Sequence, residues 1–266
     1  MINDHLKLAI RASLEAGNVI MKIYDSPFDV KLKEDKSPLT EADKQANDII
    51  NSHLRPTNIP IISEENKQTD YSIRKNWTTC WVVDPVDGTK EFVKRNGEFT
   101  VNIALITDQK PQLGVIYVPA TKVLYFADVS NKKAFKAELK SHDTTIETVL
   151  EIAQPLQPQS SATKIVRVVG SRSHMSQETM DFMDELKSDG KEVEIVSKGS
   201  SLKFCLLAEG NADVYPRFAP TMEWDTAAGQ AICNAVGIEV ISKETYQPLL
   251  YNKSNLLNPW FLVSKS

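Results

Sequence analysis

The chain has 266 residues, of which 41% are apolar and 25% are charged, so it can bury a sizeable core in one large domain or two lobes. Its formal net charge of −4 excludes general nucleic-acid binding, because association with a phosphate polymer relies on an excess of Lys and Arg. The cysteines, Cys80, Cys205 and Cys233, lack metal-binding spacing, and we expect buried free thiols in a reducing compartment. No apolar stretch approaches the ~20 residues of a membrane span, and the N-terminus has no signal-peptide pattern. We therefore expect a cytoplasmic protein, either free or in loose contact with the cytoplasmic face of the inner membrane.

Two helices are predicted at the start of the chain. Apolar residues recur at helical spacing over residues 4–24. A second helix is expected to begin at Thr40, which would be its N-cap, with Asp43 three residues later. Local capping accounts for both side chains without any catalytic role, so these two residues alone leave the question open.

An acidic pair follows the first strand-like run. Residues 59–62 form a short apolar segment, and Glu64 and Glu65 come directly after it. A solvated acidic turn is the ordinary interpretation of such a pair. A metal-binding carboxylate at the end of a strand is the alternative.

A second acidic pair follows a clearer strand. Residues 81–83 are apolar and lead into Asp84, and Pro85 is expected to end the strand because proline cannot donate a ladder hydrogen bond. Asp84 and Asp87 would then lie at the carboxyl end of a strand, where open α/β sheets bind ligands. Two carboxylates this close favour a hard cation such as Mg²⁺ between them, and Gly88 allows backbone to approach a phosphate.

The middle and second half of the chain predict different architectures. An antiparallel meander is expected over residues 100–106, 113–118 and 123–127. Residues 141–163 are rich in Asp, Thr, Gln, Pro and Ser, and we place a boundary there between an N-terminal metal-binding lobe, 1–155, and a C-terminal α/β substrate lobe, 156–266. In the second lobe we expect strand 165–169, helix 176–187, strand 193–196, helix 200–209, strand 212–215 and helix 225–236, an alternation that indicates an α/β fold.

Several residues of the second half are candidates for binding an anion. Gly170, Ser171, Arg172 and His174 follow a predicted strand; Gly199 and Ser200 open a predicted helix, with Lys203 one turn later; and Arg217 precedes a third acidic cluster. Their ordinary roles are helix capping and solvent exposure, and this alternative is strongest for Arg172 and His174. Asp225 is the expected N-cap of helix 225–236, a role that still leaves carboxylate oxygens for a metal.

Two motifs carry a resemblance to a known family. Residues 84–89, Asp-Pro-Val-Asp-Gly-Thr, resemble the D-P-[ILV]-D-G-T signature of the inositol monophosphatase superfamily of Mg²⁺-dependent, lithium-sensitive phosphatases, and residues 224–229 resemble its W-D-x-A-A-G signature. The resemblance implies a layered α/β/α/β/α fold (an α+β sandwich) with two lobes, and two or three Mg²⁺ ions. The metal ligands that it implies are Glu64, Glu65, Asp84, the Val86 carbonyl, Asp87 and Asp225. It further implies that Asp43 and Thr89 orient the attacking water, with Glu64 as a third catalytic residue.

The loops of the second half are similar to those of one branch of this superfamily. Gly-Ser-Arg-Ser-His, Gly-Ser-Ser-Leu-Lys-Phe-Cys and Tyr-Pro-Arg resemble the CysQ branch, the 3′(2′),5′-bisphosphate nucleotidases. This implies hydrolysis of adenosine 3′,5′-bisphosphate to AMP and phosphate in sulfur metabolism, with the 3′-phosphate of 3′-phosphoadenosine 5′-phosphosulfate as a further target. The implied substrate-binding residues are Glu64, Val86, Asp87, Gly88, Thr89, Gly170, Ser171, Arg172, His174, Gly199, Ser200, Lys203, Arg217 and Asp225.

Two alternatives stay open at this point. An inositol or sugar-phosphate phosphatase would use the same metals, and inositol phosphatases carry an acidic residue before Trp-Asp that meets sugar hydroxyls; Glu223 stands in that region without an assigned role. A non-catalytic nucleotide-sensing protein is the other alternative, although every implied metal carboxylate is present. The expected partner is a small nucleotide bisphosphate and no nucleic-acid polymer, with the protein a monomer or homodimer.

Overall fold

The computed structural model describes residues 3–26, 30–32, 38–158, 164–170 and 175–265. The helices are α1 (Asp4–Tyr24), α2 (Glu41–Leu54), α3 (Tyr71–Arg74), α4 (Thr89–Val93), α5 (Ile146–Ile152), α6 (Gln177–Ser188), α7 (Leu202–Ala208) and α8 (Glu223–Ala235), with a 3₁₀ turn at Arg55–Thr57. The strands are β1 (Val30–Leu32), β2 (Pro38–Thr40), β3 (Ile61–Ser63), β4 (Thr79–Asp87), β5 (Thr100–Thr107), β6 (Lys110–Val118), β7 (Val123–Asp128), β8 (Lys133–Glu138), β9 (Gln154–Pro155), β10 (Ile165–Val169), β11 (Glu192–Val196), β12 (Val214–Arg217), β13 (Ile238–Ser242) and β14 (Phe261–Lys265).

The strands form two large sheets and a small β1–β2 ribbon. The seven-stranded sheet has the order β3-β4-β5-β6-β7-β8-β9, in which β3 pairs parallel with β4 and the later neighbours pair antiparallel. The five-stranded sheet has the order β11-β10-β12-β14-β13, with β10 parallel to both of its neighbours and β14 antiparallel to both of its own. Strands β3 to β9, which end at residue 155, therefore build the first sheet, and strands from residue 165 build the second. The assignment of residues 1–155 and 156–266 to separate lobes stays a prediction.

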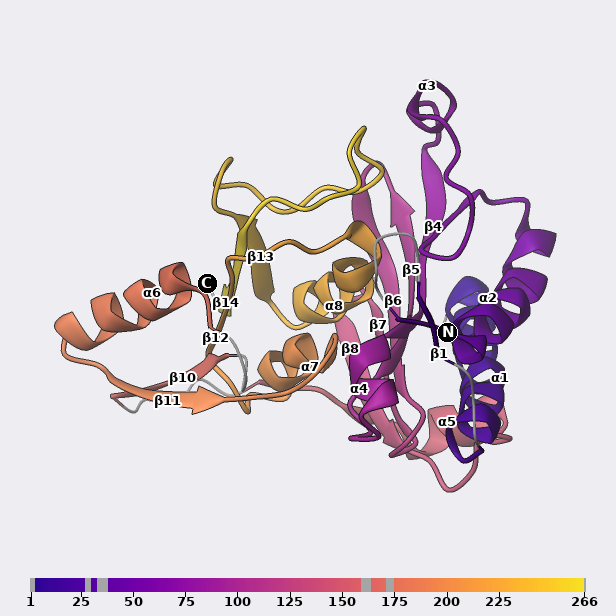
Figure 1. Cartoon of the computed structure of the whole chain (residues 1–266), viewed down its shortest axis with the longest axis horizontal. Coiled ribbons are helices and arrows are strands. Elements are labelled where there is room, and N and C mark those ends of the chain that lie inside the picture. The colour runs from indigo at the N-terminus through magenta and orange to yellow at the C-terminus, as the bar shows by residue number, and fades with distance from the viewer. Residues whose placement is uncertain (1–2, 27–29, 33–37, 159–163, 171–174, 266) are drawn as a thin grey trace.

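The helices and sheets alternate in layers (Figure 1). Helices α1 and α2 cover one face of the seven-stranded sheet, α7 and α8 lie between the two sheets, and α6 covers the outer face of the five-stranded sheet. Side-chain alternation along β4 explains this arrangement, because Trp81 and Val83 pack against α1 and α2 whereas Cys80 and Val82 face α8. The α/β/α/β/α order expected from the sequence is confirmed.

Helix α8 lies unusually close to the seven-stranded sheet. A Cβ atom built on Gly114 of β6 would stand 2.6 Å from the carbonyl oxygen of Ala228 and 2.6 Å from the Cβ of Ala231. The small residues of the Ala-Ala-Gly run and Gly114 thus allow helix and strand backbones to approach. This contact fixes the first turn of α8 above β4 and β5, where the acidic motifs meet.

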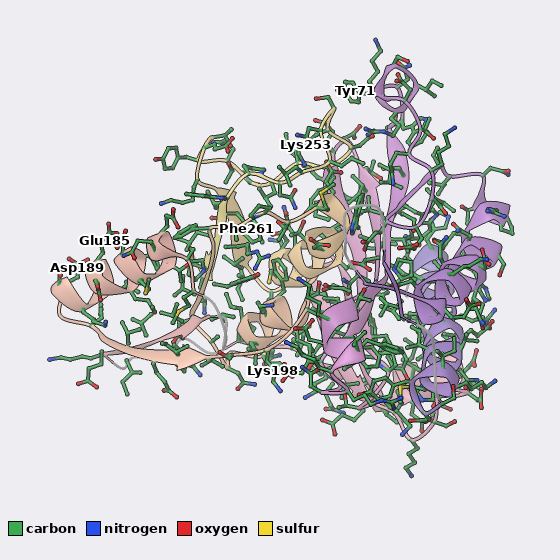
Figure 2. All side chains as sticks on the ribbon, viewed as in Figure 1. Tyr71, Glu185, Asp189, Lys198, Lys253 and Phe261 are labelled. Atoms are coloured by element: carbon green, nitrogen blue, oxygen red, sulfur yellow. The ribbon has the colours of Figure 1, made fainter. Side chains whose placement is uncertain are left out.

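Side chains distinguish the interior of the molecule from its extremities. Phe261 of β14 is fully buried between the sheets, whereas Tyr71 lies at the tip formed by α3, and Glu185 and Asp189 lie on α6 (Figure 2). The cysteines of the chain are free and buried, as predicted. In the part of the chain that the structure describes, no helix is both long enough and apolar enough to cross a membrane.

Two predicted boundaries near the acidic motifs are wrong in an informative way. Strand β4 does not end at Pro85 but continues to Asp87, because the β4–β5 register shifts between Asp84 and Asp87, and a proline at such an irregularity need not donate a ladder hydrogen bond. Helix α8 begins at Glu223 rather than at Asp225, so Asp225 is not the N-cap. Its carboxylate instead accepts the backbone N–H of Met222, 2.8 Å away, from the third position of the helix.

Smaller differences concern the second half. The helix predicted over residues 200–209 spans Leu202–Ala208, with Ser201 as its N-cap residue, and the strand predicted over 212–215 lies at Val214–Arg217. The polar stretch 141–163, in which we place the boundary, contains the short helix α5 and strand β9. Helix α5 is capped by Thr145 and buries Ile146 and Val149, a signal too short to stand out from the polar composition around it.

Candidate active site

Asp84 and Asp87 face the same side of the seven-stranded sheet because the strand that carries them is irregular. In the pairing of β4 with β5, Asp84 lies opposite Asn102 and Asp87 lies opposite Thr100, so three steps along β4 match two along β5. Residues three apart in a regular strand point to opposite faces. The extra residue restores the alternation and brings both carboxylates to the face that α8 covers.

Two further acidic residues reach Asp84 from neighbouring elements. Carboxylate oxygens of Asp84, Asp87 and Asp225 lie within 4.8 Å of one another. Because β3 is parallel to β4 with Ser63 opposite Val83, the next residue, Glu64, follows alongside Asp84, and the Glu64 N–H donates to the Val83 carbonyl at 3.2 Å. The carboxyl ends of the two parallel strands thus bring the two acidic motifs together.

The electrostatics of this cluster call for a cation. Burial raises the pKa of Asp84 well above its ordinary value, and the negative charges of Glu64, Asp87, Asp225 and Asp43 raise it further. Burial also raises the pKa of Asp225 to about 7, assisted by the charge of Asp87. Carboxylates gathered in a buried site repel one another unless a cation lies between them. An all-oxygen set fits a hard divalent ion better than a soft one.

The predicted water-orienting pair borders this cluster. Asp43 is buried in the first turn of α2, and its charge acts on Asp84. Thr89 is the first residue of α4, after Gly88 at φ +93°, and its hydroxyl donates to the Val86 carbonyl at 3.4 Å. Glu65 is half-buried, one residue beyond Glu64. The proposed N-cap role of Thr40 concerns a side chain outside the described part of the chain.

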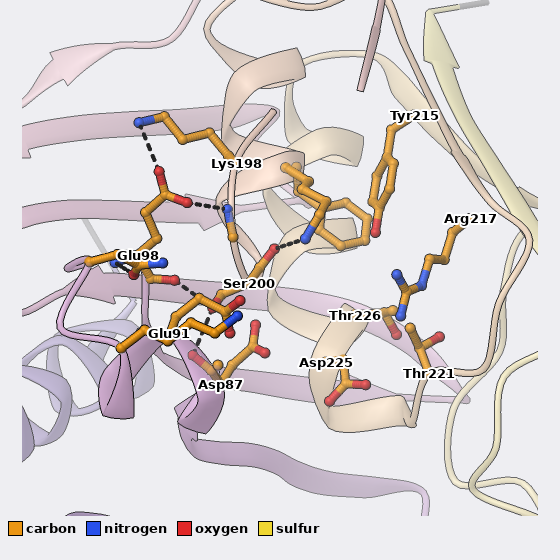
Figure 3. Close-up of a pocket in the computed structure, with 16 residues that line it drawn as sticks. Asp87, Glu91, Glu98, Lys198, Ser200, Tyr215, Arg217, Thr221, Asp225 and Thr226 are labelled. Atoms are coloured by element: carbon orange, nitrogen blue, oxygen red, sulfur yellow. Dashed lines mark hydrogen bonds and ion pairs between the residues drawn. The ribbon is translucent and has the colours of Figure 1, made fainter. Parts of the chain in front are cut away.

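A cavity of about 430 Å³ opens onto these carboxylates. Asp87, Asp225 and Arg217 line this cavity (Figure 3). Its other cationic lining residues are Lys94, Lys198 and Lys203. Burial lowers the pKa of the Lys203 ammonium, an effect that the charge of Asp87 opposes, and its Nζ donates to the Ser200 carbonyl at 3.1 Å. Arg217 donates from Nη2 to the Pro220 carbonyl at 3.0 Å. Its Nε is buried without a hydrogen-bond partner among the described residues, which leaves a donor for an anion.

The first predicted anion loop is only partly described. Gly170 lines a smaller depression beside Lys203 and Arg217. Ser171, Arg172 and His174 lie outside the described residues, so their roles stay predictions.

In the second predicted anion-binding loop, polar groups of Gly199 and Ser200 form hydrogen bonds within the protein. The Gly199 N–H donates to Glu98 Oε2 at 2.9 Å, and the Ser200 hydroxyl lies 2.8 Å from the Asp87 carbonyl and 2.7 Å from the Glu98 carbonyl. Ser200 has φ +49° and precedes the helix, so the expectation that Gly199 and Ser200 form a helix N-terminus is wrong. Both residues nevertheless line the cavity.

Glu223 has a structural environment that the sequence did not reveal. It is fully buried, and its carboxylate accepts the Lys253 ammonium at 2.6 Å and the backbone N–H groups of Asn252 and Lys253 at 2.6 and 3.0 Å. Burial raises its pKa even though Lys253 opposes the rise. Among the described residues, those that line the cavity do not include Glu223. The acid thus anchors the first turn of α8 to the loop before β14.

Sequence reasoning missed three polar residues beneath the carboxylates. Thr100, Asn102 and Ser201 are buried and hydrogen-bonded to one another or to Asp87. A signal was present, since Thr100 and Asn102 are polar side chains two residues apart on one face of a strand that is apolar at residues 101 and 103–106. Ser201 had no comparable signal, because it stands in a loop rich in polar residues.

Comparisons with known proteins agree with this geometry. The model of the Inositol monophosphatase family matches residues 2–259. The chain is 44% identical to the 3′(2′),5′-bisphosphate nucleotidase CysQ of Escherichia coli K12 over 254 residues, which cover 94% of this chain and 95% of that protein. It is 32% identical to the Haemophilus influenzae protein of the same name, with 98% and 93% of the two chains covered. The crystal structure of CysQ from Bacteroides thetaiotaomicron superposes with a TM-score of 0.87 at 48% identity, over 98% of this chain and 97% of that one. An IMPase from Thermotoga maritima shares the fold, with a TM-score of 0.71 at 20% identity over 98% and 92% of the chains.

Proposed function

The chain belongs to the inositol monophosphatase family, whose members are metal-dependent phosphatases, and we propose that it is a Mg²⁺-dependent 3′(2′),5′-bisphosphate nucleotidase. Its substrate is adenosine 3′,5′-bisphosphate, which it converts to AMP and phosphate, and 3′-phosphoadenosine 5′-phosphosulfate is a second substrate of the same chemistry. The reaction belongs to sulfonucleotide recycling.

One observation carries the proposal beyond the family. The cavity over the acidic cluster is also lined by four cationic residues, Lys94, Lys198, Lys203 and Arg217, none of which is needed as a metal ligand. The ammonium of Lys203 is desolvated by burial, and Arg217 has a buried donor without a partner among the described residues, so these two are the best placed to meet an anion. A phosphomonoester at the acidic cluster would have its charge met by the metal. A second phosphate on the same substrate gives the buried Nε donor of Arg217 and the ammonium of Lys203 a partner.

We assign the metal to the side chains that the fold brings together. Two or three Mg²⁺ ions would be held by Glu64, Asp84, Asp87, Asp225 and the Val86 carbonyl. Glu65 would support a third ion. When bound, Mg²⁺ neutralises this cluster and stabilises negative charge on the phosphoryl oxygens. The raised pKa of Asp84 and of Asp225 supports the assignment, since a cation relieves the repulsion that causes both shifts.

The remaining residues act on water and on the phosphate. Asp43 and Thr89 hold the attacking water in line with the bond between phosphorus and the 3′-oxygen. The water oxygen bonds to phosphorus, the bond to the 3′-oxygen breaks, and a proton passes to the departing nucleoside oxygen. Backbone N–H groups at Gly88 and Thr89 meet the charge that develops on the phosphoryl group. No residue of the chain forms a covalent phospho-enzyme in this scheme.

The alternative of an inositol phosphatase is weakened by Glu223. An acid that reads sugar hydroxyls must face the substrate, whereas Glu223 is committed to Lys253 and to two backbone N–H groups. A purely sensing role is weakened by the Asp84 carboxylate, which lies with those of Asp87 and Asp225 and interacts with the charges of Glu64 and Asp43 as well, because simple anion binding needs no such set of acids.

Replacement of Arg217 tests the substrate assignment. We expect Arg217→Ala to raise KM for adenosine 3′,5′-bisphosphate by about tenfold or more, as loss of a charge-assisted hydrogen bond predicts, and to change KM for adenosine 3′-monophosphate far less. Arg167→Ala is the matched control, because Arg167 lies in the same sheet but pairs with Asp213 at 2.8 Å. Equal effects of Arg217→Ala on both substrates would show that Arg217 does not read the second phosphate.

A further inference from the structure

Beneath the metal-binding carboxylates lies a hydrogen-bonded chain that no part of the mechanism uses so far. Thr100 Oγ1 donates to Asn102 Oδ1 at 2.9 Å, and Asn102 Nδ2 donates to Ser201 Oγ at 2.9 Å and to Asp87 Oδ2 at 3.3 Å. The Ser201 hydroxyl lies 2.8 Å from Asp87 Oδ2 and 2.8 Å from the carbonyl oxygen of Asp225. All three polar residues are at most 2% exposed.

Thr100 determines which end of the Asn102 amide faces the carboxylate. The Thr100 hydroxyl donates to the amide oxygen, so the NH₂ group turns toward Asp87 and Ser201. The opposite orientation would place the amide oxygen against a carboxylate oxygen, which is repulsive. The two residues are two apart on β5 and stand opposite Asp87 and Asp84 in the sheet, so backbone pairing fixes their positions.

Ser201 joins elements that are far apart in the sequence. It belongs to the loop that enters α7, between the cavity-lining residues Ser200 and Lys203, and its hydroxyl can donate to the β4 carboxylate or to the first turn of α8. The Ser201 oxygen also accepts a hydrogen bond from Asn102 Nδ2, so the single hydroxyl proton is available to Asp87 Oδ2 or to the Asp225 carbonyl. One hydroxyl therefore links Asp87 and Asp225, two of the residues assigned as metal ligands.

From this arrangement we propose that Thr100, Asn102 and Ser201 are positioning residues, which orient the Asp87 carboxylate for metal binding and hold α8 in register with it. The inference rests on the metal-dependent function proposed above. Asn102 and Ser201 both donate to Oδ2 of Asp87, which would leave Oδ1 available to a cation. Partners of this kind fix the orientation of metal-binding groups, and their loss typically weakens metal binding by about 10–100-fold.

The test measures metal binding without substrate, so it is independent of the nucleotide assignment. Titration calorimetry with Mg²⁺, and with Mn²⁺ as a second probe, gives Kd for the wild type, Ser201→Ala and the pair Thr100→Val and Thr100→Ser. We expect Ser201→Ala and Thr100→Val to raise Kd by about tenfold or more, and Thr100→Ser, which keeps the hydroxyl, to restore the wild-type value. Ser13→Ala is the matched control, since Ser13 is fully buried, its hydroxyl donates to the Ile10 carbonyl, and its helix α1 supplies none of the proposed metal ligands.

The outcomes separate positioning from structural support. Wild-type Kd in Ser201→Ala and in Thr100→Val, with folding verified by near-ultraviolet circular dichroism, would overturn the proposal. Equal weakening in Thr100→Val and Thr100→Ser would also overturn it, because packing rather than the hydroxyl would then be responsible. If Ser201→Ala does not fold, the Thr100 pair still decides. If these variants bind metal weakly but the wild type does not hydrolyse the nucleotide, the positioning role is retained and the proposed function is rejected.

Discussion

Asp84→Asn should make the metal-free protein more stable while removing its response to Mg²⁺. The substitution keeps the side chain's shape, and the amide oxygen can still accept the Val86 N–H that Asp84 accepts at 3.1 Å. It removes one charge from a buried cluster in which Glu64, Asp87, Asp225 and Asp43 all act on Asp84. A substitution that breaks a buried charge is usually destabilising, so an increase in stability is a specific consequence of the crowding of acids here.

The expected size follows from the spacing of the oxygens. Two unit charges 4.8 Å apart, the limit for the oxygens of Asp84, Asp87 and Asp225, repel by about 3.5 kcal/mol at an effective dielectric constant of about 20. Proton uptake relieves part of this repulsion, since the pKa of Asp84 is already raised. We therefore expect the free energy of unfolding in EDTA at pH 8 to rise by about 2 kcal/mol, or roughly 4–8 °C in Tm.

Thermal unfolding with and without Mg²⁺ provides the assay. The wild type should gain about 2.7 kcal/mol at a Mg²⁺ concentration of about 100 times Kd, and Asp84→Asn should gain almost nothing. Asp128→Asn is the matched control, because Asp128 is also buried but its pKa is lowered by hydrogen bonds from Ser130 and Asn131, so loss of its charge should destabilise by about 1 kcal/mol. A less stable Asp84→Asn protein in EDTA would contradict the expected repulsion among the acids. A variant that Mg²⁺ stabilises as much as the wild type would contradict the role of Asp84 as a metal ligand.

Three further predictions follow from the same geometry. Asp87→Asn should lower turnover by at least about 100-fold with the fold intact, and wild-type-like phosphate release in that variant would contradict the metal assignment. Because the folded-state pKa of Asp225 is raised to about 7, the metal-free protein should lose stability as pH rises from about 4 to about 7, and Mg²⁺ affinity should rise over the same range. The free energies of unfolding of the wild type and of Asp225→Asn, measured in EDTA from pH 5 to 8, isolate this contribution by their difference. A difference that stays constant across this pH range would exclude the raised pKa of Asp225. Glu223→Gln should destabilise by about 1–3 kcal/mol without changing the preference for bisphosphate over inositol 1-phosphate, whereas a changed preference would place Glu223 in contact with substrate.

The sequence predicted the acidic centre well because its signals are local. Asp84 and Asp87 stand at the end of an apolar run, and Asp225 stands at the start of an amphipathic helix, so strand and helix periodicity placed both at element ends. The convergence of these ends was available only through the family resemblance, because periodicity carries no information on which strands and helices meet. The bulge in β4 was missed, because a proline such as Pro85 is compatible both with the end of a strand and with an irregularity inside one, and the local sequence does not distinguish the two.

The second half was predicted less accurately near the cavity. The run from Gly199 to Lys203 looks like a helix start, but Ser200 adopts a positive φ and binds backbone carbonyls, so the helix begins later. This conformation depends on Gly88 and Glu98, more than a hundred residues earlier. The environment of Glu223 likewise depends on Lys253, a contact that no local pattern encodes. Long-range side-chain partners therefore account for most of what sequence reasoning could not supply.

The most direct test of the proposed activity is Mg²⁺-dependent phosphate release from adenosine 3′,5′-bisphosphate compared with inositol 1-phosphate, with EDTA as the control. We expect a kcat/KM that is much higher for the nucleotide, with AMP as the second product and no release in EDTA. A preference for inositol 1-phosphate would keep the metal site and contradict the assignment of Lys203 and Arg217 to a second phosphate. Release that persists in EDTA would contradict the central role of the carboxylate cluster.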